Sequence, residues 1–372
     1  MKLYDTQQRA VVPLDARPGA TMRMYVCGIT PSDATHVGHA ATFLAFDVLQ
    51  RRLQDLGCRT RCVRNITDVD DDLLARARAV GVHYLDLAAG SLAAFDADMD
   101  ALGLLRADAE PRATSAIPDI RRLIGRLLSS GHAYRSSGGV YFDTSAAQSF
   151  GELSRLDGVQ MVELARRRGG RPDDPNKRRP LDFVLWQPSS VGEPEWSASW
   201  GLGRPGWHVE CSALALTHLG ETIDVHGGGS DLVFPHHECS RAQSEAATGR
   251  RFVRHWMHTS MVRSGGAKMS KSAGNLVVVS DLRARWAPMA VRLALLGEHY
   301  RADWEWSEAS VVTATRRLER WRAAGRGDGA LAQVRERLDD DLDTPGALDA
   351  IDAAAARRVP VSDAAALLGV TL

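Results

Sequence analysis

The sequence predicts an α/β fold: a doubly wound parallel sheet with a long insertion and a C-terminal helical bundle. A β-α-β unit is predicted near the start of the chain. It consists of a mostly apolar run at residues 22–26, apolar residues at helical spacing over 38–56, and a second strand-like run at 59–63. Strand and helix patterns resume over residues 206–248, which predicts a second half of the sheet. From residue 286 onward the pattern is helical with alanine-rich faces, as in a small bundle.

The insertion is predicted to be helical first and sheet-like afterwards. Residues 73–130 show a helical pattern with a break near Pro111. Residues 132–143 carry tyrosine and valine around Ser-Ser-Gly-Gly, which is the signal of a hairpin. Residues 166–180 are basic and rich in glycine and proline, so we interpret them as an exposed loop. Sheet-like patterning resumes at residues 181–186.

The second half of the sheet is predicted from four segments. They are a helix at 206–219, a strand at 222–225, a glycine-rich turn at 226–231, and a helix at 235–248 with proline in its first turn, where a missing N–H costs little. Substrates of such sheets bind where strands meet the following loops. The loops after the first two strands are therefore the predicted site.

The composition excludes some classes of function. The 372 residues include 46 basic and 46 acidic side chains, so the formal net charge is zero. This charge balance gives no support for a broad nucleic-acid-binding surface, although it does not exclude local basic patches. Five cysteines and no charged-then-apolar leader are typical of a reduced cytoplasmic protein. No apolar run approaches the roughly 18 residues of a membrane span. We expect a soluble, cytoplasmic monomer with no membrane partner.

Residues 25–42, Y-V-C-G-I-T-P-S-D-A-T-H-V-G-H-A-A-T, combine a cysteine with two histidines at a predicted helix start. His36 and His39 stand where free N–H groups and the helix dipole favour an anion, and Gly38 allows a nucleotide to approach the backbone. This arrangement suits the triphosphate of ATP. Taken alone, the pair is explained equally well as two ordinary surface or capping histidines.

Two lysines form the second motif. Only four of the basic residues are lysines, and Lys268 and Lys271 share one loop, K-M-S-K-S, between glycines. Loops of this composition can close over a pyrophosphate and stabilise the charge that develops on it. A solvated basic loop is the alternative. The occurrence of both motifs in one chain, in this order, is more specific than either alone.

Together, H-V-G-H and K-M-S-K-S resemble the HIGH and KMSKS signatures of class I aminoacyl-tRNA synthetases. The cysteinyl-tRNA synthetase branch is similar at Y-V-C-G (25–28), N-I-T-D (65–68), G-W-H-V-E-C-S (206–212), G-G-G-S-D (227–231) and F-P-H-H-E (234–238). The resemblance implies a class I Rossmann, or nucleotidyl-transferase, fold with an inserted domain and a C-terminal helical bundle.

Cys27, Cys211 and His236 are candidate zinc ligands. Two thiolates and one imidazole leave a tetrahedral ion one open position, which is typical of a substrate-binding zinc. Such an ion takes a thiol as thiolate and would select cysteine over serine by bond type. From the residues alone, three unrelated buried side chains explain the pattern at least as well, and the resemblance favours zinc. Cys58 and Cys62 are predicted to pack in the core.

Two features depart from a cysteinyl-tRNA synthetase. Ser240 stands where that family can place an acidic zinc ligand, so we expect three protein ligands. Little sequence follows Trp306, which leaves little room to recognise a tRNA, so we do not expect tRNA as a partner.

In both features the chain resembles the mycothiol ligase family, which is related to the cysteinyl-tRNA synthetases. Similarity to that family appears at residues 28–31, 33–36, 38–42, 299–303, 340–345 and 366–370. The chain differs from the family at Ser32, where a tyrosine is usual, and at residues 167–172, where R-R-G-G-R-P replaces E-R-G-G-D-P. If the two acidic positions recognise an amino-sugar, the acceptor of this protein is a different one.

The resemblance implies an ATP-dependent, AMP-forming ligase. Cysteine is adenylated with release of pyrophosphate, and the cysteinyl group then forms an amide with the amine of glucosaminyl-inositol, in mycothiol biosynthesis. The alternatives are a cysteine-activating amide ligase with a different amine acceptor in specialised metabolism and a truncated cysteinyl-tRNA synthetase. The expected ligands are one Zn²⁺ ion, ATP with Mg²⁺, L-cysteine, and an amino-sugar or other small amine.

By resemblance, the site residues form three groups. The zinc ligands are Cys27, Cys211 and His236, and the catalytic residues, which act on the phosphates, are His36, His39, Lys268 and Lys271. The residues that line the cysteine and nucleotide pockets are Gly28, Thr30, Gly38, Thr42, Asn65, Thr67, Trp207, Gly229, Ser230, Asp231 and Val262.

From these motifs and patterns we predict that the chain is divided into five parts. They are the first half of the Rossmann catalytic domain (1–105), an inserted connective region (106–180), the second half of the Rossmann domain (181–255), the connecting region with the K-M-S-K-S loop (256–290), and the C-terminal helical bundle (291–372).

Overall fold

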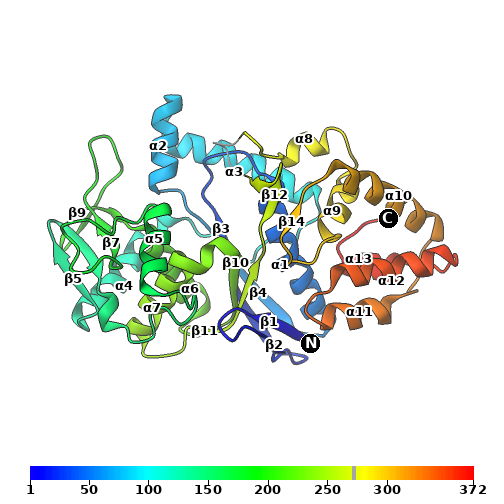
Figure 1. Cartoon of the computed structure of the whole chain (residues 1–372), viewed down its shortest axis with the longest axis horizontal. Coiled ribbons are helices and arrows are strands. Elements are labelled where there is room, and N and C mark those ends of the chain that lie inside the picture. The colour runs from blue at the N-terminus through cyan, green and yellow to red at the C-terminus, as the bar shows by residue number, and fades with distance from the viewer. Residues whose placement is uncertain (270–273) are drawn as a thin grey trace.

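The computed structural model describes residues 1–269 and 274–372, without the side chain of Lys268 (Figure 1). At its centre lie four strands, β3 (Thr21–Ile29), β4 (Arg59–Ile66), β10 (Ile223–Gly229) and β11 (Val253–Thr259). They form a parallel sheet in the order β11-β10-β3-β4. This sheet confirms the predicted α/β fold class, and the first two predicted strands lie within β3 and β4.

Helices cover both faces of the sheet. Successive residues of a strand point to opposite faces, so β3 contributes to two cores. Met24 packs in the core that contains α1 (Val37–Asp55), whereas Tyr25 and Cys27 pack in the core that contains α6 (Trp207–Leu219). The cysteine of the opening motif therefore faces α6. The helix that follows it, α1, covers the other side of the sheet.

The insertion between β4 and α6 has a sheet of its own, which lies on the left in Figure 1. Its helices are α2 (Asp71–Val80), α3 (Tyr84–Ala101), η1 (Ala113–Ala116), α4 (Ile117–Ser129), η2 (Thr144–Ala146) and α5 (Gly158–Arg167). Its strands are β5 (Ala133–Ser136), β6 (Gly139–Phe142), β7 (Phe183–Gln187), β8 (Trp196–Ala198) and β9 (Gly201–Pro205). They pair antiparallel in the order β5-β6-β7-β9-β8.

This strand pairing bears on the predicted domain boundaries. The strand expected at residues 181–186 as part of the second Rossmann half is β7, and it hydrogen-bonds to β6 and β9 of the insertion. At the other end of that half, β11 continues past residue 255 and stays paired with β10 up to Thr259. We therefore propose that the insertion ends at Pro205 and that the second half of the Rossmann domain covers residues 206–259.

The remaining elements complete the two ends of the chain. The hairpin of β1 (Lys2–Asp5) and β2 (Ala10–Pro13) lies beside β11, and β12 (Val262–Ser264), β13 (Ala267–Lys268) and β14 (Trp304–Glu305) form a small sheet. The other helices are η3 (Ser230–Leu232), the π-helical turn Val233–His237, α7 (Glu238–Thr248), α8 (Val279–Arg283), α9 (Pro288–Leu296), α10 (Glu308–Ala324), α11 (Leu331–Asp339), α12 (Thr344–Ala356) and α13 (Ser362–Leu367). Of these, α9 to α13 gather on the right in Figure 1.

A buried arginine joins these helices to the central domain. Arg292 of α9 is fully buried and forms an ion pair with Asp47 of α1. Its guanidinium also donates to the carbonyl oxygens of Leu102 and Leu368, each at 2.8 Å. A buried charge needs such a set of partners to offset its desolvation. Arg292 thereby joins α9 to α1, to the end of α3 and to the end of α13.

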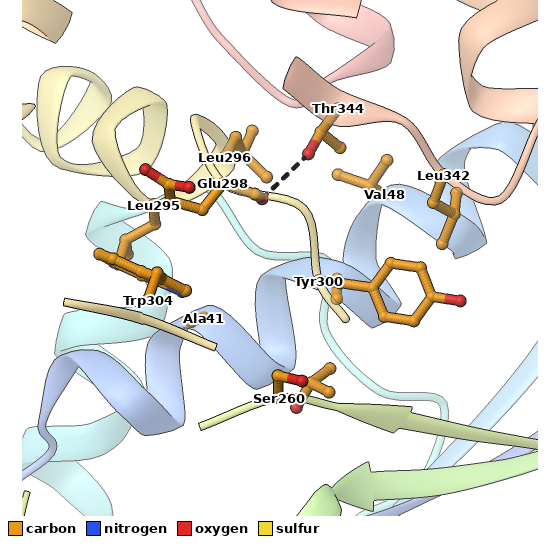
Figure 2. Close-up of a pocket in the computed structure, with 12 residues that line it drawn as sticks. Ala41, Val48, Ser260, Leu295, Leu296, Glu298, Tyr300, Trp304, Leu342 and Thr344 are labelled. Atoms are coloured by element: carbon orange, nitrogen blue, oxygen red, sulfur yellow. Dashed lines mark hydrogen bonds between the residues drawn. The ribbon is translucent and has the colours of Figure 1, made fainter. Parts of the chain in front are cut away.

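A small cavity marks the same junction (Figure 2). Val48, Leu296, Leu342 and Thr344 contribute to its lining, and the Thr344 hydroxyl donates to the carbonyl oxygen of Glu298 at 3.5 Å. The volume of about 30 Å³ has room for only a few water molecules. We therefore interpret it as packing space rather than as a substrate pocket.

No helix in the described part of the chain is long and apolar enough to span a membrane.

One prediction of local structure was wrong. The turn predicted at residues 226–231 is extended strand as far as Gly229, and glycine is needed there because a Cβ on Gly227 would lie 1.8 Å from the carbonyl oxygen of Met257. The helix predicted from residue 235 is present: after Phe234, which has an extended backbone with φ −136° and ψ 135°, residues 235–237 are helical and lead directly into α7. Helix α5, at the edge of the predicted basic loop, was not predicted.

Candidate active site

Three buried side chains with metal-binding chemistry meet near the carboxyl ends of the parallel strands. Cys27 lies in β3 on the α6 face, Cys211 lies near the start of α6, and His236 lies in the turn before α7. Their ligand atoms are all within 4.8 Å of one another, and Cys27 Sγ is 3.8 Å from Cys211 Sγ. The structure therefore brings together the three predicted zinc ligands from distant parts of the chain.

The surroundings of these side chains suit a metal ion. Burial raises the pKa of the Cys27 thiol, whereas the hydrogen bond from that thiol lowers the pKa of Cys211. A divalent cation can replace the proton between the two sulfurs, because it binds cysteines as thiolates. The His236 ring stacks on Trp207 with 4.2 Å between centroids, and its Nδ1 lies 3.1 Å from Nδ1 of His208. Such contacts hold the orientation of a metal-ligating imidazole.

Sequence reasoning missed a second set of histidines beside Cys27. Cys27, His226 and His237 form another group whose ligand atoms lie within 4.8 Å of one another. His237 Nε2 is 3.1 Å from Cys27 Sγ, its Nδ1 is 2.7 Å from His258 Nε2, and His258 Nδ1 is 2.7 Å from Thr6 Oγ1. Burial lowers the pKa of these imidazoles, that of His258 to about 3. They are therefore neutral at pH 7, which is the form in which an imidazole binds a metal ion.

The loops after β3 and β4 are joined by hydrogen bonds among predicted pocket residues. Asn65 Oδ1 accepts from the Gly28 N–H at 2.9 Å, and Asn65 Nδ2 donates to Thr67 Oγ1 at 2.9 Å. A Cβ on Gly28 would lie 1.7 Å from the Asn65 carbonyl oxygen, so only glycine permits this close approach. Thr30 Oγ1 donates to Asp70 Oδ2 at 2.7 Å. The Asn65 side chain is 2% exposed, so its contacts are with Gly28 and Thr67 rather than with a ligand. The Thr30 side chain is half-buried.

Two acidic residues that sequence reasoning did not single out lie close to this pocket. Asp70 caps α2, with its Oδ1 accepting from the Leu73 N–H at 2.8 Å, and burial raises its pKa to about 6. Glu210 is fully buried, and neither of its carboxyl oxygens has a hydrogen-bond partner among the described residues. Burial, and then the charge of Asp70, raise the pKa of Glu210 well above its usual range. Glu210 lies in a quoted motif and Asp70 follows another by two residues, but only the fold brings the two close enough for their charges to interact.

The helix start predicted to bind phosphates combines a capping histidine with the N-terminus of a long helix. His36 is the N-cap of α1, with its Nδ1 accepting from the Gly38 N–H at 3.1 Å, and its ring stacks on that of His39 with 3.8 Å between centroids. His36 is thus a capping histidine, and the N-terminus of a long helix is also a favourable site for an anion. Thr42 Oγ1 lies 2.8 Å from Thr259 Oγ1, so α1 is joined to the end of β11.

The other predicted nucleotide residues come from the end of β10 and from the small sheet. Gly229 ends β10, and Ser230 and Asp231 begin η3. Val262 is buried in β12, which pairs with β13 through Lys268. Lys271 lies outside the described residues, so the structure places only the start of the K-M-S-K-S loop.

A cleft of about 320 Å³ opens beside Ser230. It is lined by Tyr4 and Thr6 from the N-terminal segment, by Phe234, and by Arg168 from the loop at residues 167–172. Arg168 is half-buried and donates to the carbonyl oxygen of Phe234 at 2.5 Å. The structure thus places this loop next to a predicted nucleotide residue, which the sequence did not indicate.

Known proteins share this fold. The family described as tRNA synthetases class I (C) catalytic domain matches residues 14–316. The structure of Mycobacterium tuberculosis methionyl-tRNA synthetase in complex with methionyl-adenylate is similar, with a TM-score of 0.67 and 19% sequence identity, and covers 91% of this chain and 82% of that chain. The fold and the site define a class I synthetase-type catalytic domain.

Two curated relatives identify the branch. The L-cysteine:1D-myo-inositol 2-amino-2-deoxy-alpha-D-glucopyranoside ligase of Acidothermus cellulolyticus is 53% identical over an alignment of 357 positions, and the alignment covers 94% of this chain and 88% of that protein. A protein of the same description from Mycobacterium marinum is 49% identical over 395 residues, covering 100% of this chain and 96% of the relative. The chain belongs to this ligase family, and it is an enzyme.

Proposed function

We propose that this enzyme adenylates L-cysteine with ATP and transfers the cysteinyl group to the amine of glucosaminyl-inositol, forming an amide in mycothiol biosynthesis. The observation that carries the proposal is the buried group of Cys27, Cys211 and His236. It adds thiol-selective ligand chemistry to a nucleotide-binding scaffold of the class I synthetase type. The relatives support the same two substrates, because they are described as ligases of L-cysteine and this amino-sugar.

Zinc is assigned to Cys27, Cys211 and His236. Two thiolates make this group softer than the alternative of Cys27 with His226 and His237, and three ligands leave one tetrahedral position open. When bound, the ion would supply a Lewis-acid position for the substrate thiolate. His237, at hydrogen-bond distance from Cys27 Sγ, would then orient that ligand rather than bind the metal.

ATP is assigned to the loops at the carboxyl edge of the sheet. The N–H groups at the start of α1, with His36 and His39, would face the phosphates. The residues proposed for the ribose, the adenine and the pyrophosphate are Gly229, Ser230, Asp231, Val262, Lys268 and Lys271, and Gly38 and Thr42 complete the α1 side. A magnesium ion would accompany the nucleotide.

The reaction has two steps. In the first, a carboxylate oxygen of cysteine attacks the α-phosphorus of ATP, and the bond to the β-phosphate oxygen breaks to release pyrophosphate. The positive end of α1 and the His36–His39 pair would stabilise the charge that develops on the phosphates. In the second, the acceptor amine attacks the acyl carbon, loses a proton, and AMP leaves. Holding the reactants in place supplies much of the rate.

The acceptor is assigned to the cleft beside Ser230. The cleft joins a segment proposed to contact the ribose with Arg168 of the loop at residues 167–172. The guanidinium of Arg168, together with the hydroxyls of Tyr4 and Thr6, offers donors and acceptors to a polyol. An acceptor bound there would lie beside the adenylate.

A second candidate keeps the cysteine chemistry and changes the acceptor. Residues 167–172 carry arginine at two positions where the resemblance leads one to expect acids. Arg167 pairs with Glu163 at 2.9 Å, so one of these arginines is already engaged by its own helix. A cysteine ligase for another small amine is the function that this difference favours.

Product analysis separates the two candidates. The protein is incubated with cysteine, ATP and Mg²⁺, with glucosaminyl-inositol or a panel of other amines, and the amides are identified by mass spectrometry. ATP–pyrophosphate exchange with a panel of amino acids identifies the donor. We expect exchange with cysteine and an amide with glucosaminyl-inositol. Cysteine-dependent exchange with acylation of a different amine only would support the second candidate.

A further inference from the structure

Two segments that have no role in the proposed function, residues 299–303 and 340–345, meet at one buried carboxylate. It belongs to Asp341, in the connection between α11 and α12, and this residue is 5% exposed. The connection has an unusual backbone, because Asp341 and Leu342 have positive φ angles of 60° and 51°. Residues with a side chain rarely adopt this conformation, and it persists where surrounding contacts determine it. The partners of Asp341 therefore decide its position.

The carboxylate of Asp341 accepts hydrogen bonds from two other parts of the chain. Its Oδ1 accepts from the Tyr4 N–H at 2.8 Å and from the Tyr300 hydroxyl at 2.6 Å. Its Oδ2 accepts from Arg301 Nε at 2.7 Å and also from Arg301 Nη2. The Asp341 N–H in turn donates to the carbonyl oxygen of Lys2 at 3.0 Å. One residue of the C-terminal bundle thus joins β1 to the segment that precedes β14.

The segment of Tyr300 and Arg301 supports the strand that is proposed to contact the adenine. The Ser260 N–H donates to the Tyr300 carbonyl oxygen at 2.7 Å, and the Ser260 hydroxyl donates to the Arg301 carbonyl oxygen at 2.5 Å. Tyr300 and Ser260 also line the same small cavity (Figure 2). Further along, Trp304 of β14 pairs with Val262 of β12. A shift of this segment would therefore move β12, and with it β13, which leads into the K-M-S-K-S loop.

The other partner, Tyr4, lines the cleft that is proposed for the acceptor. Asp341 holds the Tyr4 backbone through the N–H, and the guanidinium of Arg301 lies over the Tyr4 ring, 4.5 Å from its centroid. A cation at this distance from an aromatic ring is attracted to its face. The cleft residue Thr6 follows in the same segment, and its N–H donates to the Trp256 carbonyl oxygen at 2.9 Å. The carboxylate thus fixes Tyr4 directly at its backbone and, through Arg301, at its ring.

We propose that Asp341 is a positioning residue that holds two walls of the active site in a fixed relation. Through Tyr300 and Arg301 it places β12 against the adenine, and through Arg301 and Tyr4 it shapes the acceptor cleft. This inference rests on the proposed function. It gives the C-terminal bundle a role in binding both ATP and the acceptor, and Asp341 acts through its neighbours rather than by contact with either substrate.

Asp341→Asn is the decisive substitution, because it breaks one contact and keeps the size of the side chain. An amide oxygen at the Oδ1 position still accepts from Tyr4 and Tyr300, whereas an amide nitrogen at the Oδ2 position cannot accept from Arg301. Tyr300→Phe is the milder second variant, since it removes one hydroxyl and keeps the ring.

Asp339→Asn is the matched control. Asp339 ends α11 two residues before Asp341, and its carboxylate also joins the bundle to the central domain, through Arg52 of α1 at 3.0 and 2.8 Å. In the described part of the chain it makes no hydrogen bond to the partners of Asp341. The control therefore loosens the attachment of the bundle without touching either wall of the site.

The assays measure binding and stability separately. ATP–pyrophosphate exchange gives kcat and the KM values for ATP and cysteine, and amide formation with glucosaminyl-inositol gives the KM for the acceptor. Thermal unfolding gives the Tm of each variant, and the kinetics are measured well below the lowest Tm. Cysteine is the internal reference, because Cys27, Cys211 and His236 lie on elements that Asp341 does not contact.

We expect Asp341→Asn to raise the KM for ATP and the KM for the acceptor about tenfold each, with a smaller change in kcat and an unchanged KM for cysteine. Tyr300→Phe should raise the KM for ATP about threefold. Asp339→Asn should lower the Tm and keep the wild-type KM for both substrates.

A wild-type KM for either substrate in folded Asp341→Asn would overturn the inference, because Asp341 would then only attach the bundle. Equal increases in Asp339→Asn would overturn it as well, since any loosening of the bundle would then suffice. If Asp341→Asn does not fold, a wild-type KM for ATP in Tyr300→Phe decides against it. A wild-type protein without cysteine-dependent exchange would instead overturn the proposed function.

Discussion

Replacing Asp70 by asparagine should stabilise the folded protein at neutral pH. Burial raises the pKa of Asp70 from 3.8 to about 6. Its ionised form is therefore less favourable in the folded than in the unfolded chain, by about 3 kcal/mol at about 1.36 kcal/mol per pKa unit. Asparagine removes this penalty and keeps the cap on α2.

The same shift determines the sign of the pH dependence. Below pH 3.8 the carboxyl is protonated in both states and costs nothing. As the pH rises from there, the unfolded chain ionises first, so the wild-type protein loses stability until the pH passes about 6. The stability difference between the two proteins should therefore be largest at neutral pH and should vanish in acid.

Thermal unfolding of the zinc-loaded, substrate-free proteins tests this. With an unfolding entropy of roughly 2.1 cal/mol/K per residue, about 3 kcal/mol corresponds to a rise in Tm of about 4 °C for 372 residues. Asp72→Asn, at an exposed position, should leave the Tm within a degree or so of the wild-type value. A Tm of Asp70→Asn equal to or below the wild-type value at neutral pH would refute the reasoning.

Three further predictions concern the assigned site. Cys211→Ser should abolish zinc binding and cysteine-dependent ATP–pyrophosphate exchange together, as measured by metal analysis and exchange; exchange by a metal-free variant would contradict the zinc assignment. Lys271→Ala should slow adenylate formation roughly a hundredfold while zinc stays bound, and an unchanged single-turnover rate would argue against the pyrophosphate role. Arg168→Ala should raise the KM for the acceptor amine about tenfold without affecting exchange, because a charged donor in the cleft is lost. Arg166→Ala, at an exposed position that pairs with Asp173, is its control, and equal acceptor KM values in the two variants would exclude the cleft.

Local patterns in the sequence were sufficient for the fold class. The apolar run before Cys27, the helix after Gly38 and the strand before Asn65 all have their predicted identity, because each is determined by contacts between neighbouring residues and by a hydrophobic period. The turn predicted at the glycines after His226 was wrong, since their role is to let β10 approach β11. That requirement comes from another strand and leaves no local signal.

The insertion shows the same limit. The strand pattern at residues 181–186 predicted a strand correctly, but its partners are β6 and β9 and not the parallel sheet. Alternation of side chains tells which residues form a strand, whereas the choice of sheet depends on pairing between segments far apart in the chain.

The candidate site was predicted in part. Cys27, Cys211 and His236 were named from ligand chemistry and resemblance, and the structure brings their ligand atoms within 4.8 Å. His237, Asp70 and Glu210 were not assigned any role, although His237 and Glu210 lie in recognised motifs and Asp70 follows one by two residues. What these residues do depends on distances to Cys27 and Thr30, which sequence spacing does not contain.

The sequence by itself determined the α/β class and the ligase family, and it named Cys27 of the opening segment as a candidate metal ligand. The tertiary structure decided which side chains from other segments complete that chemistry. Cys27 faces Cys211 because alternate residues of β3 point to opposite faces of the sheet, and Thr30 meets Asp70 because β3 and β4 end at the same edge. Motifs specify residue types, and it is strand pairing and helix packing over long sequence separations that set the distances on which binding and catalysis depend.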